Sequence, residues 1–176
     1  MNRMFKKGIL SYLLLFLFLN FSCSQNNFQS KLTSFEHQNF EAKVIRIIDG
    51  DTMEVLYEET PIRIRLAHID CPEKRGKQPF GNRAKQALSD LCFGQNVTVY
   101  GENYDRYKRL IAVIINESKQ TVNKQLVKQG MAWHFKRYST DASYSQLEQQ
   151  ARGKKLGLWQ DPKPIAPWNW RKSNTL

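Results

Sequence analysis

The stretch VIRIIDGDTMEVLY, residues 44–57, contains the pattern that decides the fold. Its β-branched and aromatic residues flank an Asp-Gly pair, a pattern that favours two short strands joined by a tight turn. A hairpin needs only one acid at that turn, yet Asp51 follows Gly50 directly after Asp49. Two acids this close repel each other unless a positive charge lies beside them. A bound cation is one explanation of the stretch, and a surface turn with solvated acids is the other.

The two strands of this hairpin and three later segments are strand-like runs. Each is rich in β-branched residues and bounded by turn signals, and together they span residues 40–48, 52–57, 61–69, 96–101 and 109–115. The third run alternates, with Ile62, Ile64 and Leu66 on one face and Arg63, Arg65 and Ala67 on the other. We therefore expect a half-buried strand with arginines on its wetter side.

Helical spacing of apolar residues appears in residues 81–94, 121–130 and 142–159. Gly94 is suited to ending the first helix, and Gly153 interrupts the last at a cost of about 1 kcal/mol relative to Ala. Five short strands with a helix after the third predict an α+β fold, a five-stranded OB-fold barrel with three helices. An open α+β sheet is the alternative. OB barrels often bind oligonucleotides, but a fold alone does not give a function.

The N-terminus has the layout of a secretory signal peptide. Residues 1–22 place Arg3, Lys6 and Lys7 before an apolar run that is short for a membrane span. Cys23 follows as in the lipobox of bacterial lipoproteins, although Asn20 stands where that motif has an aliphatic residue. We expect lipidation at Cys23; ordinary cleavage or an uncleaved anchor are the alternatives. Residues 23–39 then form a polar tether, residues 40–161 the domain, and residues 162–176 a C-terminal tail.

Charge and cysteine content narrow the class of partner and the compartment. Cleavage before Cys23 removes three of the 27 Lys and Arg and none of the 16 Asp and Glu, so the formal charge falls from +11 to +8. Such an excess favours polyanions, meaning nucleic acid or anionic membranes. In an exported protein Cys71 and Cys92 can form a disulfide. The alternative is that each is a small buried hydrophobe.

Three clusters carry most of the candidate chemistry: IDGDT at 48–52, RLAHIDCPE at 65–73 and YDRYKR at 104–109. Asp70 ends a strand and Pro72 fixes the following turn, which holds Glu73 three residues away. If the turn with Asp51 lies beside the strand end with Asp70, their carboxylates form an oxygen site for a hard cation such as calcium.

The motifs VIRIIDGDT, IRLAHIDCPE, YDRYKR and KKLGLW resemble, in order and rough spacing, those of the staphylococcal (micrococcal) nuclease or thermonuclease-like family. The resemblance covers about residues 40–160. It implies that one calcium ion is bound by Asp51, Asp70 and the backbone carbonyl of Cys71. It also implies that Glu73 acts on the attacking water and that Arg65 and Arg109 grip the phosphate. A divalent cation and two guanidinium groups suit phosphodiester hydrolysis, because they stabilise the charge of the transition state.

The remaining candidates concern the substrate. Lys108 stands where many members of the family have glycine, and it either alters the loop or adds a phosphate contact. Tyr107, Lys108 and Tyr138 are the expected substrate-binding residues, with Tyr104 as another that can line the site. For Trp133 and Phe135, core packing competes with base stacking. His68 is expected inside the strand, where it packs, and His37 falls in the tether.

These observations favour an exported, calcium-dependent phosphodiesterase, an endo- or exonuclease, anchored to a bacterial membrane through Cys23. Secretion or a periplasmic location is the alternative. We expect a monomer that cleaves DNA and RNA and favours single strands, with little sequence preference because it recognises the sugar-phosphate backbone. The resemblance implies that the products are 3′-phosphorylated. A second hypothesis is a non-catalytic, surface-anchored OB module that binds nucleic acid. A third is a basic lipoprotein that binds acidic polymers in general.

Overall fold

The computed structural model describes residues 35–174, and from Glu36 onward they belong to one compact unit. The predicted signal peptide, Cys23 and most of the tether lie outside the described residues. Within the described part of the chain, no helix is long and apolar enough to cross a membrane. Residues just before Phe40 also join the domain, since the backbone N–H of His37 donates to the carbonyl of Glu102 at 3.3 Å.

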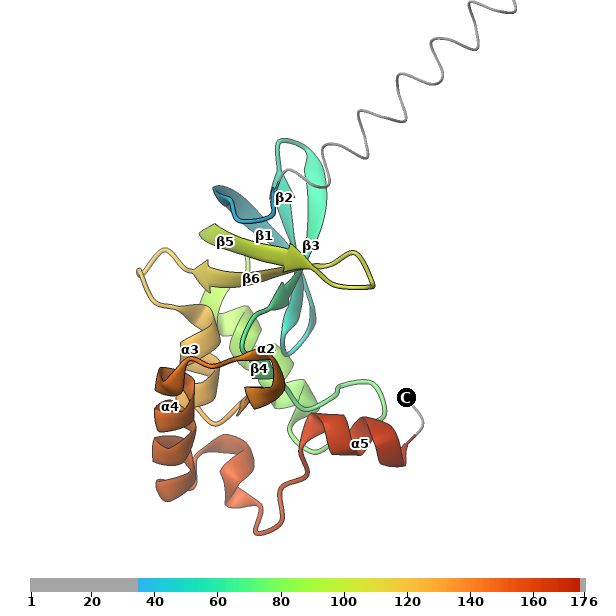
Figure 1. Cartoon of the computed structure of the whole chain (residues 1–176), viewed down its shortest axis with the longest axis vertical. Helices are drawn as coiled ribbons and strands as arrows, with labels where there is room; N and C mark the ends of the chain where they lie inside the picture. The colour runs from blue at the N-terminus through green and yellow to red at the C-terminus, as the bar shows by residue number, and fades with distance from the viewer. Residues whose placement is uncertain (1–34, 175–176) are drawn as a thin grey trace, which may run out of the picture. The chain divides into compact units, whose positions relative to one another are not determined.

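Five strands close into a barrel, as the sequence predicts (Figure 1). They are β1 (Asn39–Asp49), β2 (Thr52–Tyr57), β3 (Thr60–Leu66), β5 (Asn96–Tyr104) and β6 (Leu110–Ile115). The order around the barrel is β1-β2-β3-β6-β5, with β3 and β6 parallel and the other pairs antiparallel. Because β1 is long enough to pair with both β2 and β5, the sheet closes. The open-sheet alternative is therefore excluded.

The barrel core follows the expected alternation. Ile62, Ile64 and Leu66 are buried, whereas Arg63 is exposed. In β1 the alternation breaks at Ile45, which is 39% exposed, because a register shift between Val44 and Arg46 adds a residue on the outer side.

The three predicted helices are present, with different ends. They are α2 (Gly81–Cys92), α3 (Val122–Lys128) and α4 (Ala142–Gly153). Helix α4 stops at Gly153, and residues 157–160 form a short 3-10 helix, η3 (Gly157–Gln160), instead of continuing it. A Cβ on Gly157 would lie 2.2 Å from the carbonyl oxygen of Gly130. The chain therefore leaves the helical path before Gly157, where the backbones of Gly157 and Gly130 lie too close together for a Cβ.

A fourth helix lies in the segment expected as a tail. Helix α5 (Pro167–Ser173) begins with a proline, which suits a helix start. Its side chains reach the predicted active site, as described below. The segment 162–176 is thus part of the folded domain as far as Asn174, the last described residue.

The predicted strand 61–69 is interrupted at His68. This residue has φ 67°, so β3 ends at Leu66 and a separate β4 (Ile69–Asp70) pairs with β7 (Trp133–His134). The expectation that His68 lies inside a strand is therefore wrong, but its ring does pack, 4.9 Å from that of Tyr144. Its Nδ1 lies 3.0 Å from Ser139 Oγ within the short connection after the 3-10 helix η2 (Lys136–Tyr138).

Of the two alternatives for Cys71 and Cys92, the disulfide is not formed, and both residues are buried free thiols. Cys71 Sγ donates to the Gly50 carbonyl at 3.3 Å, while Cys92 Sγ donates to the Leu88 carbonyl at 3.2 Å inside α2. Each sulfur is packed into different surroundings, so the small-hydrophobe interpretation describes both. Burial raises the pKa of both thiols, that of Cys92 to about 12.

Candidate active site

The Asp-Gly-Asp turn is set by packing rather than by a left-handed backbone. In the hairpin Asp49 pairs with Thr52, and Gly50 is not among the residues with positive φ. A Cβ on Gly50 would instead lie 2.7 Å from the Cβ of Ala84 and 2.8 Å from that of Cys71. Glycine is therefore required because helix α2 and the chain after Asp70 press against the turn. Asp49 serves the turn, accepting from the Gly50 N–H at 2.8 Å, and burial raises its pKa.

Arg65 joins the two acids that the sequence predicts as metal ligands. Its Nη1 lies 3.1 Å from Asp51 Oδ2 and its Nη2 lies 2.8 Å from Asp70 Oδ1. The Arg65 side chain is 13% exposed and that of Asp70 is 1% exposed, so the contact is largely withdrawn from water. Burial raises the pKa of Asp70, and the adjacent Arg65 opposes that effect. The structure thus brings Asp51, Asp70 and Arg65 together.

Asp51 is fixed by further contacts around the turn. Its Oδ2 accepts from the backbone N–H of Cys71 at 2.8 Å, and its Oδ1 accepts from Thr52 Oγ1 at 3.1 Å. The backbone carbonyl of Asp51 accepts from the Leu66 N–H at 2.9 Å. These bonds tie the hairpin to the end of β3 and to the start of the Asp70–Glu73 segment.

Glu73 is held by its backbone from the next loop. Gln78 is 5% exposed and makes two hydrogen bonds to the Glu73 backbone. Its side-chain Oε1 accepts from the Glu73 N–H at 2.9 Å, and its backbone N–H donates to the Glu73 carbonyl at 3.1 Å. Gly81, the first residue of α2, lies so close that a Cβ there would be 2.4 Å from the Glu73 carbonyl oxygen. The position of Glu73 therefore depends on the start of α2.

Arg109 reaches Asp51 through one intermediate residue. Its Nη1 donates to Thr52 Oγ1 at 3.4 Å, and Thr52 in turn donates to Asp51. Asp105 orients the guanidinium, with Oδ2 accepting from Nε at 2.7 Å. Although burial alone would raise the pKa of Asp105, the hydrogen bonds from Arg109 lower it. Arg109 is thus held beside the site with its side chain 25% exposed.

Lys108 takes the backbone conformation that a glycine would adopt easily, with φ 60°. A left-handed conformation costs a residue with a Cβ about 1–2 kcal/mol. We therefore expect Lys108→Gly to raise the free energy of unfolding by about 0.5–1 kcal/mol, after the greater chain entropy of glycine is subtracted. Urea unfolding measures this effect. Arg106→Gly, in the same turn without positive φ, should lower stability, and equal losses in both variants would contradict the argument.

The predicted substrate-binding tyrosines are both exposed on the surface. Tyr107 is 63% exposed, and Arg109 lies 5.5 Å from its ring centroid. Tyr138 is 67% exposed and packs edge-on against Phe135. Tyr104 differs, because its hydroxyl is buried without a hydrogen-bond partner.

The aromatic residues after β4 pack within the domain. Trp133 lies edge-on to Trp159, with ring centroids 4.5 Å apart, and Phe135 is stacked on Trp168 of α5 at 5.3 Å with an interplanar angle of 3°. These contacts favour the packing interpretation for Trp133 and Phe135.

Arg171 of α5 is the site residue that the sequence reasoning missed. Its Nη2 lies 2.7 Å from Asp70 Oδ2, and its Nη1 lies 2.5 Å from Glu73 Oε1. Burial alone would lower the pKa of Arg171, but hydrogen bonds and charge from Asp70 and Glu73 raise it. The run PWNWRK at 167–172 was the available signal, since it combines tryptophans with basic residues.

The residues present fit a hard divalent cation. The carboxylates of Asp51 and Asp70 both contact the Arg65 guanidinium. The Cys71 thiol instead donates to the Gly50 carbonyl. Within residues 35–174, no three His, Cys, Asp or Glu side chains gather as a metal centre. Side chains would therefore supply two carboxylates, and backbone carbonyl, water or substrate oxygens would complete an oxygen set of the kind calcium prefers.

Comparison with known proteins gives a consistent result. A sequence model of the family described as staphylococcal nuclease homologue matches residues 63–161. Protein ParB of Escherichia coli is 43% identical over 142 residues, covering 75% of this chain and 79% of that protein. A micrococcal nuclease of Shigella flexneri is 42% identical over 146 residues, covering 77% and 83%. An uncharacterized endonuclease of Haemophilus influenzae is 41% identical over 146 residues, covering 82% and 80%. With this barrel and these matches, the chain belongs to the staphylococcal nuclease family.

Proposed function

We propose that the protein is a calcium-dependent nuclease that hydrolyses DNA and RNA with little sequence preference and leaves 3′-phosphorylated products. The observation that carries the proposal is the contact of Arg65 with both Asp51 and Asp70, with Glu73 three residues further on and Arg109 linked through Thr52. Family membership and relatives named as nucleases support the same activity.

In this proposal Asp51 and Asp70 hold the cation, which would polarise the phosphate and offset its developing charge. Arg65 and Arg109 face the phosphate oxygens, because the planar guanidinium can donate to two oxygens at once. Glu73 accepts a proton from the attacking water or orients it. The contacts made by these residues are to the backbone of the substrate, which is why little sequence preference is expected.

The exposed rings of Tyr107 and Tyr138 support single strands as the favoured substrate, since unpaired bases can stack on aromatic side chains regardless of sequence. The excess of basic residues predicts binding that weakens with salt.

The experiment is digestion of single-stranded DNA and RNA by the full chain in mild detergent, with calcium, with magnesium or with chelator. Glu73→Gln keeps the size of the side chain but removes its charge and basicity, so we expect kcat to fall at least about 100-fold. Glu41→Gln, at an exposed position of β1, is the matched control and should keep full activity.

The opposite outcome would favour a different function. Tight nucleic-acid binding without cleavage in any metal would support the non-catalytic OB module. Competition by heparin with no effect of metal on binding would support a general polyanion-binding lipoprotein.

We also propose that the protein is exported and anchored through a lipid on Cys23, acting as a monomer. The basic start, apolar run and cysteine of residues 1–23 support this. Mass spectrometry of the membrane fraction tests it, because a Cys23→Ser variant should lose the lipid mass and leave the membrane.

A further inference from the structure

Both carboxylate oxygens of Asp70 are occupied by arginines from different parts of the chain. Oδ1 accepts from Arg65 at 2.8 Å, whereas Oδ2 accepts from Arg171 at 2.7 Å. The other Arg171 nitrogen, Nη1, lies 3.3 Å from Asp70 Oδ1 and 2.5 Å from Glu73 Oε1. The Arg171 guanidinium thus bridges the proposed metal ligand and the proposed water-activating acid.

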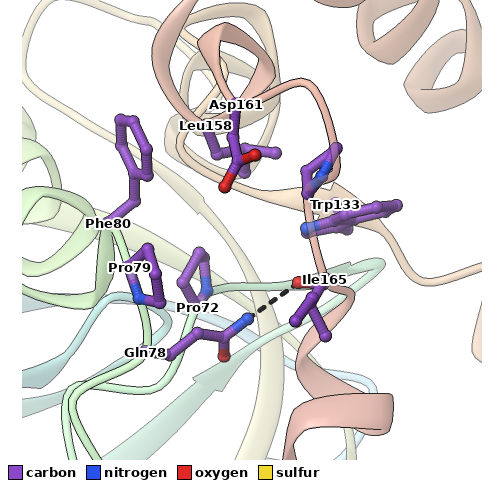
Figure 2. Close-up of a pocket in the computed structure, with 9 residues that line it drawn as sticks. Pro72, Gln78, Pro79, Phe80, Trp133, Leu158, Asp161 and Ile165 are labelled. Carbon is purple, nitrogen blue, oxygen red and sulfur yellow. Dashed lines mark hydrogen bonds between the residues drawn. The ribbon is translucent and has the colours of Figure 1, made fainter.

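A small set of contacts holds α5 in this position. Trp168 stacks on Phe135 and lies edge-on to Trp133, with ring centroids 5.6 Å apart. The segment before the helix is held by Gln78, whose Nε2 donates to the Ile165 carbonyl at 2.8 Å. Figure 2 shows this bond beside a pocket that has Pro72 and Pro79 on one side and Trp133 and Ile165 on the other.

These contacts are of a kind that can open locally. Helix α5 has seven residues, too few to be stable without its packing. It adds no strand to the barrel, and the Arg171 side chain is 33% exposed. A short peripheral segment of this kind can detach at a free energy far below that of global unfolding.

The charge of Arg171 opposes that of a divalent cation at the same acids. A guanidinium that donates to Asp70 and Glu73 neutralises part of the negative charge that would attract a metal ion. In addition, two cations a few ångströms apart repel each other. Arg65 also lies against these acids, at Asp51 Oδ2 and Asp70 Oδ1, so what distinguishes Arg171 is that it occupies Asp70 Oδ2.

We propose that Arg171 is a further functional residue of the site. It competes with the metal ion for Asp70 and thereby sets the affinity of the site for that ion. The inference rests on the proposed function, because it takes Asp51 and Asp70 as ligands of calcium. Metal binding displaces the guanidinium from Asp70 Oδ2 and loosens α5, which stays tethered through residues 161–166. The site therefore takes calcium more weakly than its acids alone would allow.

The test is calorimetric titration of the full chain in mild detergent with calcium, without nucleic acid. Arg171→Met removes the charge while keeping an unbranched side chain that favours helix. We expect it to bind calcium at least about tenfold more tightly than the parent. Lys172→Met removes a charge from the next, exposed residue of the same helix, and should bind like the parent.

Two further measurements distinguish the effect of removing the Arg171 charge from that of a folding defect. Trp168→Ala weakens the docking of α5 while keeping Arg171, and should also bind calcium more tightly. In the parent, backbone amides of residues 167–173 should exchange with deuterium faster when calcium is added.

Equal calcium affinity in Arg171→Met and Lys172→Met, or slower exchange of α5 with calcium, would overturn the role of Arg171 and leave the proposed nuclease intact. No calcium binding in any of the variants would overturn the calcium assignment, and this inference with it.

Discussion

Arg65→Ala is expected to lower kcat about 1,000-fold while KM changes only a few-fold. A guanidinium aimed at the phosphate stabilises charge that develops in the transition state, and loss of one such donor costs about 3–4 kcal/mol of activation free energy. Arg65→Lys should recover little of this, because an ammonium group cannot reproduce the two-pronged contact with Asp51 and Asp70.

The same substitution should also lower stability, by about 3 kcal/mol, since it removes a partner from two acids that are at least nine-tenths buried. Activity is therefore measured below the melting temperature of each variant, with calorimetry beside the kinetics. Arg63→Ala is the matched control on the same strand, because its ion pair with Glu54 is solvent-exposed on the arginine side. Full activity of Arg65→Lys would contradict the role given to Arg65.

Gly81→Ala is expected to have the second-largest effect, although Gly81 has no side chain that could take part in catalysis. A Cβ there would meet three backbone atoms of Glu73 and Lys74 at 2.4–2.8 Å. Backbone cannot rotate away as a side chain can, so the Glu73 segment must move. A displacement of about 1 Å at a catalytic group can cost about 100-fold in rate, and overpacking costs about 1–3 kcal/mol in stability.

The control for this prediction is Gly153→Ala. A Cβ on Gly153 would have nothing within 4 Å, and the residue lies in helix α4. This change should raise stability by up to about 1 kcal/mol and leave kcat unchanged. Equal kinetics in the two alanine variants would show that the close approach of Gly81 does not position Glu73.

Much of the barrel and of the candidate site follows from local sequence. Period-two alternation in residues 60–66 was sufficient to place Ile62 and Ile64 inside and Arg63 outside. The motif residues Asp51, Asp70 and Arg65 do meet, as the motifs predicted, because the hairpin and the end of β3 are neighbours in the barrel.

Other features followed from long-range packing that no local pattern shows. At the interruption, His68 contacts Ser139, 71 positions away, and the two cysteines have different surroundings. An Asp-Gly pair signals a tight turn from local sequence, but the contacts with Ala84 and Cys71 that require glycine at position 50 come from packing.

By itself, the sequence determined the five strands of the barrel, the first three helices and the acids and arginines of the motifs, because side-chain periodicity and motif spacing are local properties of the chain. Only the tertiary structure decided that a seven-residue helix near the C-terminus reaches the site. Arg171 meets Asp70 across 101 positions of sequence. That contact depends on where the barrel, the Gln78 loop and the stacked tryptophan place the end of the chain, and a single short segment contains no information about such a meeting.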